Sequence, residues 1–393
     1  MDPISIGALT RPIVFFMTRS DVFTPLTKPI LWACHMLPIY RQRDGVNTKE
    51  KNKESFRKSS QVLKNGRNLL IFGEGETYDV FVRHLKPIKK GAVRMGFIAL
   101  ESMDWKKKIY ISAIGINYSE PNRMRSDYLM AYSDRICLND YRSDYETNAN
   151  RTIADLTKKV EDLMKTTVTH VENKDLTPLH ENIMMLTRKG IHPICFDKKT
   201  DLKIRWEYSR ALASKINEAN TNGEDLSEIR EMIEHYLQKV KKKKLSENDV
   251  YLISSGKIKE ERSGSIIKLI FLFLPMIPGM IHFYLPYHFA KNFAEKKFKR
   301  KVFWGSVKLV AGFISMGLFN IPFIFLFHAF IYPNYWLALL YYFLTPFFGL
   351  AAWEWFTALK NLKHYKQIER KSIEDINPER KALLEMIEQR FSI

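Results

Sequence analysis

The sequence predicts an α/β domain with a mixed sheet and flanking helices, followed by a helical region and C-terminal transmembrane helices. Up to residue 147, short β-rich runs alternate with helical segments. Strand patterns are missing from 148–262, where long helical periodicities take over. The region 263–357 holds apolar runs of membrane-crossing length, and 358–393 reads as a helical tail.

Composition limits the classes of function. The chain has 393 residues, 46% of them hydrophobic, which is ample for a folded core. Its net charge of +19 indicates an anionic partner, namely nucleic acid, anionic lipid or a phosphorylated substrate. No helix-turn-helix, RNP-like strand or zinc spacing supports nucleic acid, and we predict none as a partner. Three scattered cysteines also argue against a structural metal site.

The first region shows strand and helix patterns in alternation. We predict strands at Pro12–Arg19, Leu69–Phe72 and Ile109–Tyr118, because these runs are rich in β-branched and aromatic residues. Helices are predicted at Ser55–Lys64 and Ala92–Glu101, where apolar residues recur with helical spacing. This alternation is typical of helices packed against a sheet.

The middle region contains amphipathic helices. One apolar face is formed by Ile153, Leu156, Val160, Leu163, Met164 and Val168, and a second by Leu226, Ile229, Ile233 and Leu237. The second helix ends in a basic run, Lys239 and Lys241 to Lys244. That run is either a solvated helix end or a contact with an acidic membrane surface.

Two apolar runs are predicted to span a membrane. We assign transmembrane helices to 307–331 and 335–357, which carry few charges and are flanked by aromatic residues suited to the membrane interface. The alternative, buried helices of a soluble core, fits their length less well. The protein is therefore expected to be an integral membrane protein in contact with membrane lipids.

Charges around a third apolar segment, 266–289, predict how it lies. The loop after it is strongly basic (Lys291, Lys296, Lys297, Lys299, Arg300 and Lys301), whereas the turn Tyr332-Pro333-Asn334 has no basic residue. The positive-inside rule places the basic loop, the preceding domain and the tail 358–393 in the cytoplasm. A segment with both ends on one side cannot cross once. We therefore predict a re-entrant or surface-lying hairpin that turns at Pro275 to Gly279.

Three ordered motifs in the first region carry a family resemblance. "MLPIYRQRDG" contributes Pro38, Ile39 and Arg41; "FGEGE" contributes Phe72, Glu74 and Gly75; and "ISAIGINY" has Ala113 where a proline is usual. Together with the lysine-rich "LKPIKKGAVRMGF", they resemble the glycerol-phosphate acyltransferase family (1-acylglycerol-3-phosphate and glycerol-3-phosphate acyltransferases of phospholipid biosynthesis). The resemblance covers about the first third of the chain.

The resemblance implies a reaction and a set of site residues. The family transfers a fatty acyl group from an acyl thioester, acyl-CoA or acyl-carrier protein, to glycerol 3-phosphate or lysophosphatidate, without a bound cofactor. Arg41 is then expected to bind the acceptor's phosphate, because its planar guanidinium suits that group. Glu74 is expected to hold the glycerol hydroxyls, and Gly75 to let the backbone approach the ligand. Possible further cations are Arg83, Lys86, Lys89 and Lys90.

Structural interpretations of the same residues stay open. A Glu-Gly pair after a strand is often only a turn, and a single Arg41 is often a surface ion-pair partner.

The spans after the domain resemble the larger glycerol 3-phosphate or dihydroxyacetone phosphate acyltransferases, which favours a glycerol-phosphate-type acceptor.

The family's first motif is present only in part. Its catalytic pair is a histidine general base followed four or five residues later by an aspartate. Asp2-Pro3 match the aspartate end, whereas His35 and His84 are the nearest histidines and lie at other spacings. Either Met1 is an internal methionine of a longer chain, or the protein is a degenerate form. The alternative function is therefore a catalytically inactive, membrane-tethered substrate-binding or scaffold protein.

Overall fold

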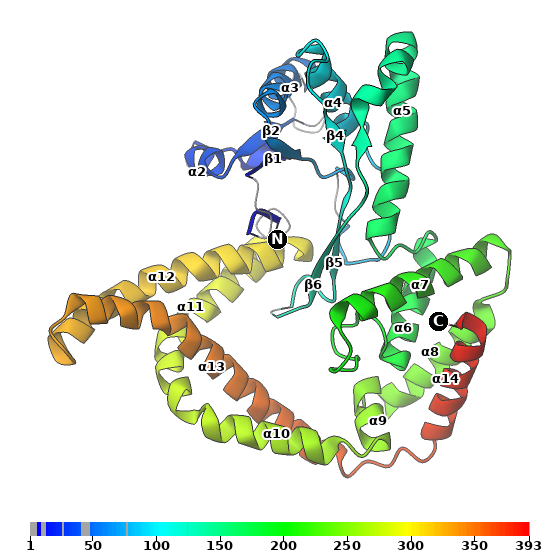
Figure 1. Cartoon of the computed structure of the whole chain (residues 1–393). Coiled ribbons are helices and arrows are strands. Elements are labelled where there is room, and N and C mark those ends of the chain that lie inside the picture. Colours follow the sequence, from blue (N-terminus) through cyan, green and yellow to red (C-terminus); the bar gives the residue numbers. More distant parts are fainter. Residues whose placement is uncertain are drawn as a thin grey trace. The chain divides into compact units, whose positions relative to one another are not determined.

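The computed structural model describes residues 6–8, 13–25, 27–40, 48–75, 78–123 and 125–392 (Figure 1). The chain forms two compact units. The first unit comprises Met1–Tyr78, Val82–Ser119 and Asp127–Lys174, and the second comprises Asp79–Phe81, Glu120–Ser126 and Asp175–Ile393. All strands in the described part of the chain belong to the first unit, and the second unit is helical.

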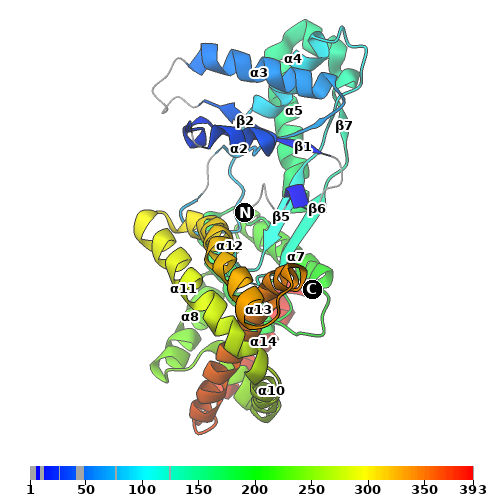
Figure 2. The same ribbon diagram turned by 90° about the vertical axis from the view of Figure 1, so that its left-hand side faces the viewer.

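A three-stranded parallel sheet organises the first unit. Its order is β2 (Met36–Ile39), β1 (Val14–Arg19), β3 (Asn68–Leu70). The connections run through α2 (Lys28–Ala33) and α3 (Thr48–Lys64), as parallel neighbours require a crossover. Helices α3 and α4 (Gly91–Glu101) lie on the same side of the sheet in both views (Figure 1; Figure 2). Because the three strands are parallel, their carboxyl ends lie at the same edge of the sheet.

The predicted strand at Ile109–Tyr118 is two strands in different sheets. β4 (Tyr110–Ile111) pairs with β7 (Ile136–Cys137), and β5 (Ile114–Tyr118) pairs with β6 (Tyr128–Tyr132), both antiparallel. The prediction of one strand was wrong, because the run changes partners at residues 112 and 113. The predicted strand at Leu69–Phe72 is confirmed with shifted bounds, since β3 ends at Leu70.

Helices α4 and α5 (Arg142–Thr167) share the main apolar core of the first unit. Phe97 and Leu100 of α4 are fully buried, and they pack with Leu156 and Val160 of α5. This confirms the predicted apolar face of the middle region's first helix from Ile153 to Leu163, whereas Val168 follows the helix in extended backbone. The backbone of α5 is kinked at Asn148, beside the predicted boundary at residue 147.

One part of the second unit is a bundle of helices. It includes α6 (Thr177–Thr187), α7 (Leu202–Thr221), α8 (Ser227–Lys242), α9 (Glu247–Ser254) and, from the end of the chain, α14 (Asn377–Phe391). The predicted face of α8 is confirmed, because Ile229 and Ile233 are completely buried. Part of its basic end pairs with acids near α14, including Lys239 with Glu379 at 2.8 Å.

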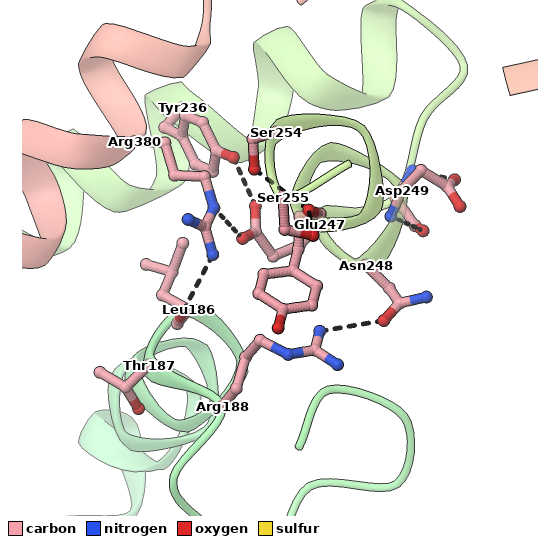
Figure 3. A network of polar contacts seen from close by, with 12 residues as sticks. Leu186, Thr187, Arg188, Tyr236, Glu247, Asn248, Asp249, Ser254, Ser255 and Arg380 are labelled. Atoms are coloured by element: carbon pink, nitrogen blue, oxygen red, sulfur yellow. Dashed lines mark hydrogen bonds and ion pairs between the residues drawn. The ribbon is translucent and has the colours of Figure 1, made fainter. Parts of the chain in front are cut away.

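A buried ion pair joins the last helix to this bundle (Figure 3). Arg380 Nε donates to Glu247 Oε1 at 2.5 Å, and its Nη2 donates to the carbonyl of Leu186 at 3.3 Å. The hydroxyl of Tyr236 donates to the same carboxylate. Burial raises the pKa of Glu247 above its ordinary value, although the nearby Arg380 favours the charged form. The pair thus connects α6, α8, α9 and α14 through buried side chains.

Two helices of the second unit are long and apolar enough to cross a membrane. They are α12 (Trp304–Phe330, with the preceding turn from Lys301) and α13 (Tyr335–Ile368), which cover the predicted spans except for Ile331. Both expose large apolar side chains, such as Phe313 and Phe343. This indicates membrane association.

The predicted hairpin turn at Pro275 to Gly279 is wrong in position. The segment forms α10 (Ile258–Phe271) and α11 (Phe273–Lys297), which are bent by 71° at Leu272. Pro275 lies in the first turn of α11, where backbone N–H groups have no helical partner, so the missing N–H does not end the helix. Pro278 and Pro286 are accommodated inside α11.

The Arg380–Glu247 pair makes the first prediction. Arg380→Met should lower the free energy of unfolding by about 3–5 kcal/mol, because it leaves the buried carboxylate of Glu247 without its cation. Adding Glu247→Gln should restore part of the loss. Lys381→Met, at an exposed neighbouring position on α14, is the control and should have little effect. Urea unfolding of the detergent-solubilised full chain measures the difference. Equal effects of Arg380→Met and Lys381→Met would show that the pair contributes nothing to stability.

Candidate functional site

The candidate site is a turn at the carboxyl edge of the parallel sheet. After β3 the chain forms the Glu74 turn, residues 72–75, in which the amide of Gly75 donates to the carbonyl of Phe72 at 3.2 Å. Gly75 has φ +69°, a conformation that a side chain disfavours. In open α/β sheets, ligands bind outside the carboxyl ends of parallel strands. The turn therefore lies where a ligand is expected.

The Glu74 carboxylate holds the chain that follows through a hydrogen bond to Lys86, which we call the clasp. Its Oε2 accepts from the amide of Lys86 at 3.2 Å, and the carbonyl of Gly73 accepts from the amide of Lys89 at 2.8 Å. The amide of Ile88 between them donates to Glu161 of α5 at 2.9 Å. These three bonds hold the lysine segment, residues 86–90, beside the Glu74 turn.

Lysine side chains surround the turn. The ammonium of Lys86 lies 4.1 Å from the ring centre of Tyr78, and that of Lys174 lies 4.9 Å from the same ring. Lys89 and Lys90 are exposed, and the side chain of Lys89 lies 3.5 Å from the place of a Cβ on Gly75. Among the described residues, no carboxylate forms an ion pair with Lys86, Lys89 or Lys90. These cations are therefore available to an anionic ligand.

The start of α4 adds further positive potential. The helix begins at Gly91, directly after Lys90, and its first turn contains no acid. Unpaired backbone N–H groups and the helix dipole favour an anion there. Arg83, the other predicted helper, is 4% exposed, so its guanidinium is less accessible than the lysines.

Two histidines lie beside the same loop. His84 Nδ1 is 2.9 Å from the carbonyl of Val171, which fixes that nitrogen as the N–H donor and leaves Nε2 to accept a proton. His170 Nδ1 accepts from the amide of Leu85 at 3.0 Å. Burial, together with the positive charge of Lys165 and the nearby His84, lowers the pKa of His170 to about 4, and Glu172 opposes this weakly. His170 is thus a neutral, structural imidazole near neutral pH.

The structure separates the predicted site residues into three groups. Glu74, Gly75, Lys86, Lys89 and Lys90 come together at one strand end. Asp2 and Arg41 lie outside the described residues. Arg83 forms the third group, because its side chain is buried. His35, which was not predicted to take part, precedes β2, so about four residues of strand, roughly 13 Å, separate it from the carboxyl edge.

Some neighbours of the site were not predicted from the sequence. Tyr78, His170 and Lys174 join it, and the last two come from a segment almost 100 residues downstream of Glu74. At the end of β2, Asn52 of α3 brackets Tyr40 with two hydrogen bonds, of 2.9 and 2.8 Å. No local sequence signal shows these contacts, because each depends on how distant elements pack. Among the described residues, no group of three or more His, Cys, Asp or Glu could hold a metal ion.

Comparison with known proteins finds a family match for the first region. Residues 1–117 match the family model Acyltransferase. No curated protein and no solved structure matches the chain. The matched region contains the parallel sheet, the Glu74 turn and the lysine segment. The match supports an acyltransferase family and a transferase activity for this chain.

The pKa of His170 makes the second prediction. Between pH 6.5 and 4 the unfolded chain binds a proton at this residue and the folded chain does not, so stability should fall as the pH falls through this window. The loss attributable to His170 is at most about 3 kcal/mol. His170→Asn keeps an acceptor for the Leu85 amide and cannot be protonated, so its stability should depend less on pH.

Urea unfolding of the full chain at both ends of this pH range tests the point. His288→Asn, at an exposed position with no carboxylate partner among the described residues, is the control and should keep the wild-type pH dependence. A His170→Asn variant with the wild-type pH dependence would contradict the assignment.

Proposed function

We propose that this protein is a membrane-bound acyltransferase that transfers a fatty acyl group from acyl-CoA or acyl-carrier protein to glycerol 3-phosphate or lysophosphatidate in phospholipid synthesis. The observation that supports it most is the clasp between Glu74 and the amide of Lys86, which holds lysines that pair with no carboxylate among the described residues at a strand end inside the acyltransferase match. The clasped loop combines a carboxylate for hydroxyls with cations for a phosphate, and the proposed acceptors contain both groups.

Each part of the acceptor has a matching group. The phosphate binds to Lys86, Lys89 and the amino end of α4, with Arg41 as the bidentate partner that the motif implies. The glycerol hydroxyls bind to the Glu74 carboxylate, which can accept several hydrogen bonds besides that of the Lys86 amide. The positive φ of Gly75 lets the ligand approach the backbone.

The transfer step is a displacement at the thioester. The acceptor's hydroxyl oxygen attacks the thioester carbonyl carbon, the new C–O bond forms, and the C–S bond breaks. A base takes the hydroxyl proton, and the departing thiolate gains a proton. In the family the base is a histidine held by an aspartate, and Asp2 matches the aspartate. Two imidazoles adjoin the clasped loop, His84 and His170, and of these His84 has an Nε2 that can accept a proton.

The candidate membrane helices bear on where in the cell this reaction takes place. We propose that α12 and α13 cross the membrane and that the acyltransferase region faces the cytoplasm, where acyl-CoA and acyl-carrier protein are found. The basic residues between α11 and α12, and the turn after α12 that lacks them, support this orientation.

An acceptor series tests the proposed function. Membranes containing the protein receive a radiolabelled acyl thioester with glycerol 3-phosphate, lysophosphatidate, or monoacylglycerol, which has no phosphate. We expect labelled product from the phosphorylated acceptors alone. A parallel equilibrium measurement with labelled glycerol 3-phosphate should show that the acceptor binds, whether or not the chain contains the base. Glu74→Gln should weaken this binding, because a neutral amide replaces the negatively charged carboxylate that accepts hydrogen bonds from the hydroxyls. Glu54→Gln on α3 should leave binding unchanged. Preference for monoacylglycerol would refute a phosphate acceptor, and binding without product would indicate the inactive alternative.

Arg41 makes a separate prediction. Arg41→Ala should weaken binding of the phosphorylated acceptor by about 1.5–3 kcal/mol, the usual range for a hydrogen bond to a charged group. Arg41→Lys should recover only part of this, because a point charge replaces a planar fork. Equilibrium binding of labelled glycerol 3-phosphate measures both. Unchanged binding in a folded Arg41→Ala variant would assign Arg41 to a structural ion pair.

A further inference from the structure

A polar centre lies where α11, α12 and α13 meet. His282 of α11 is 1% exposed, with its Nδ1 2.5 Å from Asn320 Oδ1 of α12 and its Nε2 2.5 Å from the hydroxyl of Tyr341 of α13. Asn320 is equally buried and also donates to the carbonyl of Met316 at 2.9 Å. These three residues, the His282 centre, satisfy one another inside an otherwise apolar group of helices.

Small residues allow the backbones to approach closely at the same place. A Cβ on Gly279 of α11 would overlap the carbonyl of Phe348 and contact Ala352 of α13. A Cβ on Gly349 of α13 would in turn press on the ring of Phe283. Such small residues are typical of helix contacts inside membranes, where packing replaces the hydrophobic effect.

Contacts at the ends extend this attachment. Near the basic loop, Lys308 of α12 pairs with Glu295 of α11 at 2.7 Å. On α10, Lys268 pairs with Glu354 of α13 at 2.9 Å, and the carbonyl of Leu269 accepts from Trp355 Nε1 at 3.0 Å. Figure 1 shows α10 running beside α13 and α11 beside α12. The bent pair therefore follows both candidate spans.

The outer side of α10 and α11 is as apolar as that of the candidate spans. Ile270 is 68% exposed, Phe271 77% and Leu274 74%, comparable with Phe313 of α12 at 77% and Phe343 of α13 at 69%. Further exposed members are Ile266, Ile267, Phe273, Ile277, Ile281, Tyr284, Leu285, Tyr287 and Phe289. An apolar surface of this extent is unstable in water, and here it continues the surface of two membrane-length helices.

We infer that α10 and α11 enter the bilayer as a bent third element, and that the His282 centre is the polar lock that fixes α11 between α12 and α13. Lipid acyl chains cover the outer face of α10 and α11, because this apolar face continues the exposed apolar surface of the membrane-length helices α12 and α13. Burying a histidine and an asparagine in this apolar setting is costly unless they are paired, and here each pairs with the other. The inference does not depend on the proposed acyl transfer.

The lipid-facing surface is tested by spin labels on the full chain in phospholipid nanodiscs. Cys34, Cys137 and Cys195 are replaced by Ala, and single cysteines are introduced at Phe271, Leu274, Phe313 or Phe343, with the exposed Lys203 of α7 as the water-facing control. Labels at 271 and 274 should collide readily with oxygen and poorly with a water-soluble nickel chelate, like those at 313 and 343. Accessibility like that at 203 would overturn the inference, and so would spin–spin broadening at 271 and 274 alone, which would indicate a second copy on this face.

The lock is tested by cross-linking in the same nanodiscs. The Cβ of Ala290 on α11 lies 3.9 Å from the place of a Cβ on Gly312 of α12, a separation that suits a disulfide. Ala290→Cys with Gly312→Cys should cross-link rapidly. Adding His282→Leu should slow the reaction about fivefold or more, because Asn320 and Tyr341 lose their partner. His288→Leu, at an exposed histidine on the same helix, should leave the rate unchanged.

Equal cross-linking rates in the two histidine variants would overturn the lock. If His282→Leu prevents insertion, His282→Gln decides the matter, because an amide retains hydrogen-bonding groups and should keep at least part of the wild-type rate. A His282→Gln variant no better than His282→Leu would contradict a role for hydrogen bonds at this position.

Discussion

The clasp between the Glu74 carboxylate and the Lys86 amide is the constraint on which the candidate site depends. It closes the loop after β3 and, with the bond from the Lys89 amide to Gly73, keeps the lysine segment beside the Glu74 turn. These bonds, together with that from the Ile88 amide to Glu161, give the lysines a fixed position relative to the strand end. The ammonium groups lack carboxylate partners among the described residues. A charged ligand would therefore complete an arrangement that the backbone has already built.

Two clusters of buried polar side chains in the second unit are each completed by partners from other helices, although their surroundings differ. In the helical bundle, Arg380 and Glu247 are buried as an ion pair that ties the C-terminal helix to three others. In the apolar helices, His282 is buried against Asn320 and Tyr341, without charge compensation. Each group is completed by partners from other helices, since an unpaired one would be costly. Both centres therefore fix helix positions that apolar packing alone leaves less defined.

Periodic segments could be predicted from the sequence, and long-range pairings could not. Val14–Arg19 and the buried faces of α5 and α8 follow from local patterns. The division of the 109–118 run depends on β6 and β7, whose short runs give weak signals. The bend lies at Leu272, three residues before Pro275, because a proline disfavours the helical turn that precedes it, whereas Pro278 and Pro286 are tolerated inside α11. Glu74 and the lysines were predicted by motif, but Lys174 and His170 reach the site only through tertiary packing.

Hydrogen exchange across the clasped loop tests the central claim most directly. The amides of Gly75, Lys86 and Lys89 are all engaged in the clasp or the turn, so a ligand that completes the site should slow their exchange. We predict that glycerol 3-phosphate protects peptides covering residues 73–90 in the full chain, and that glycerol does not. Unchanged exchange in these peptides at saturating glycerol 3-phosphate, or equal protection by glycerol, would contradict a phosphate-acceptor site at the Glu74 turn.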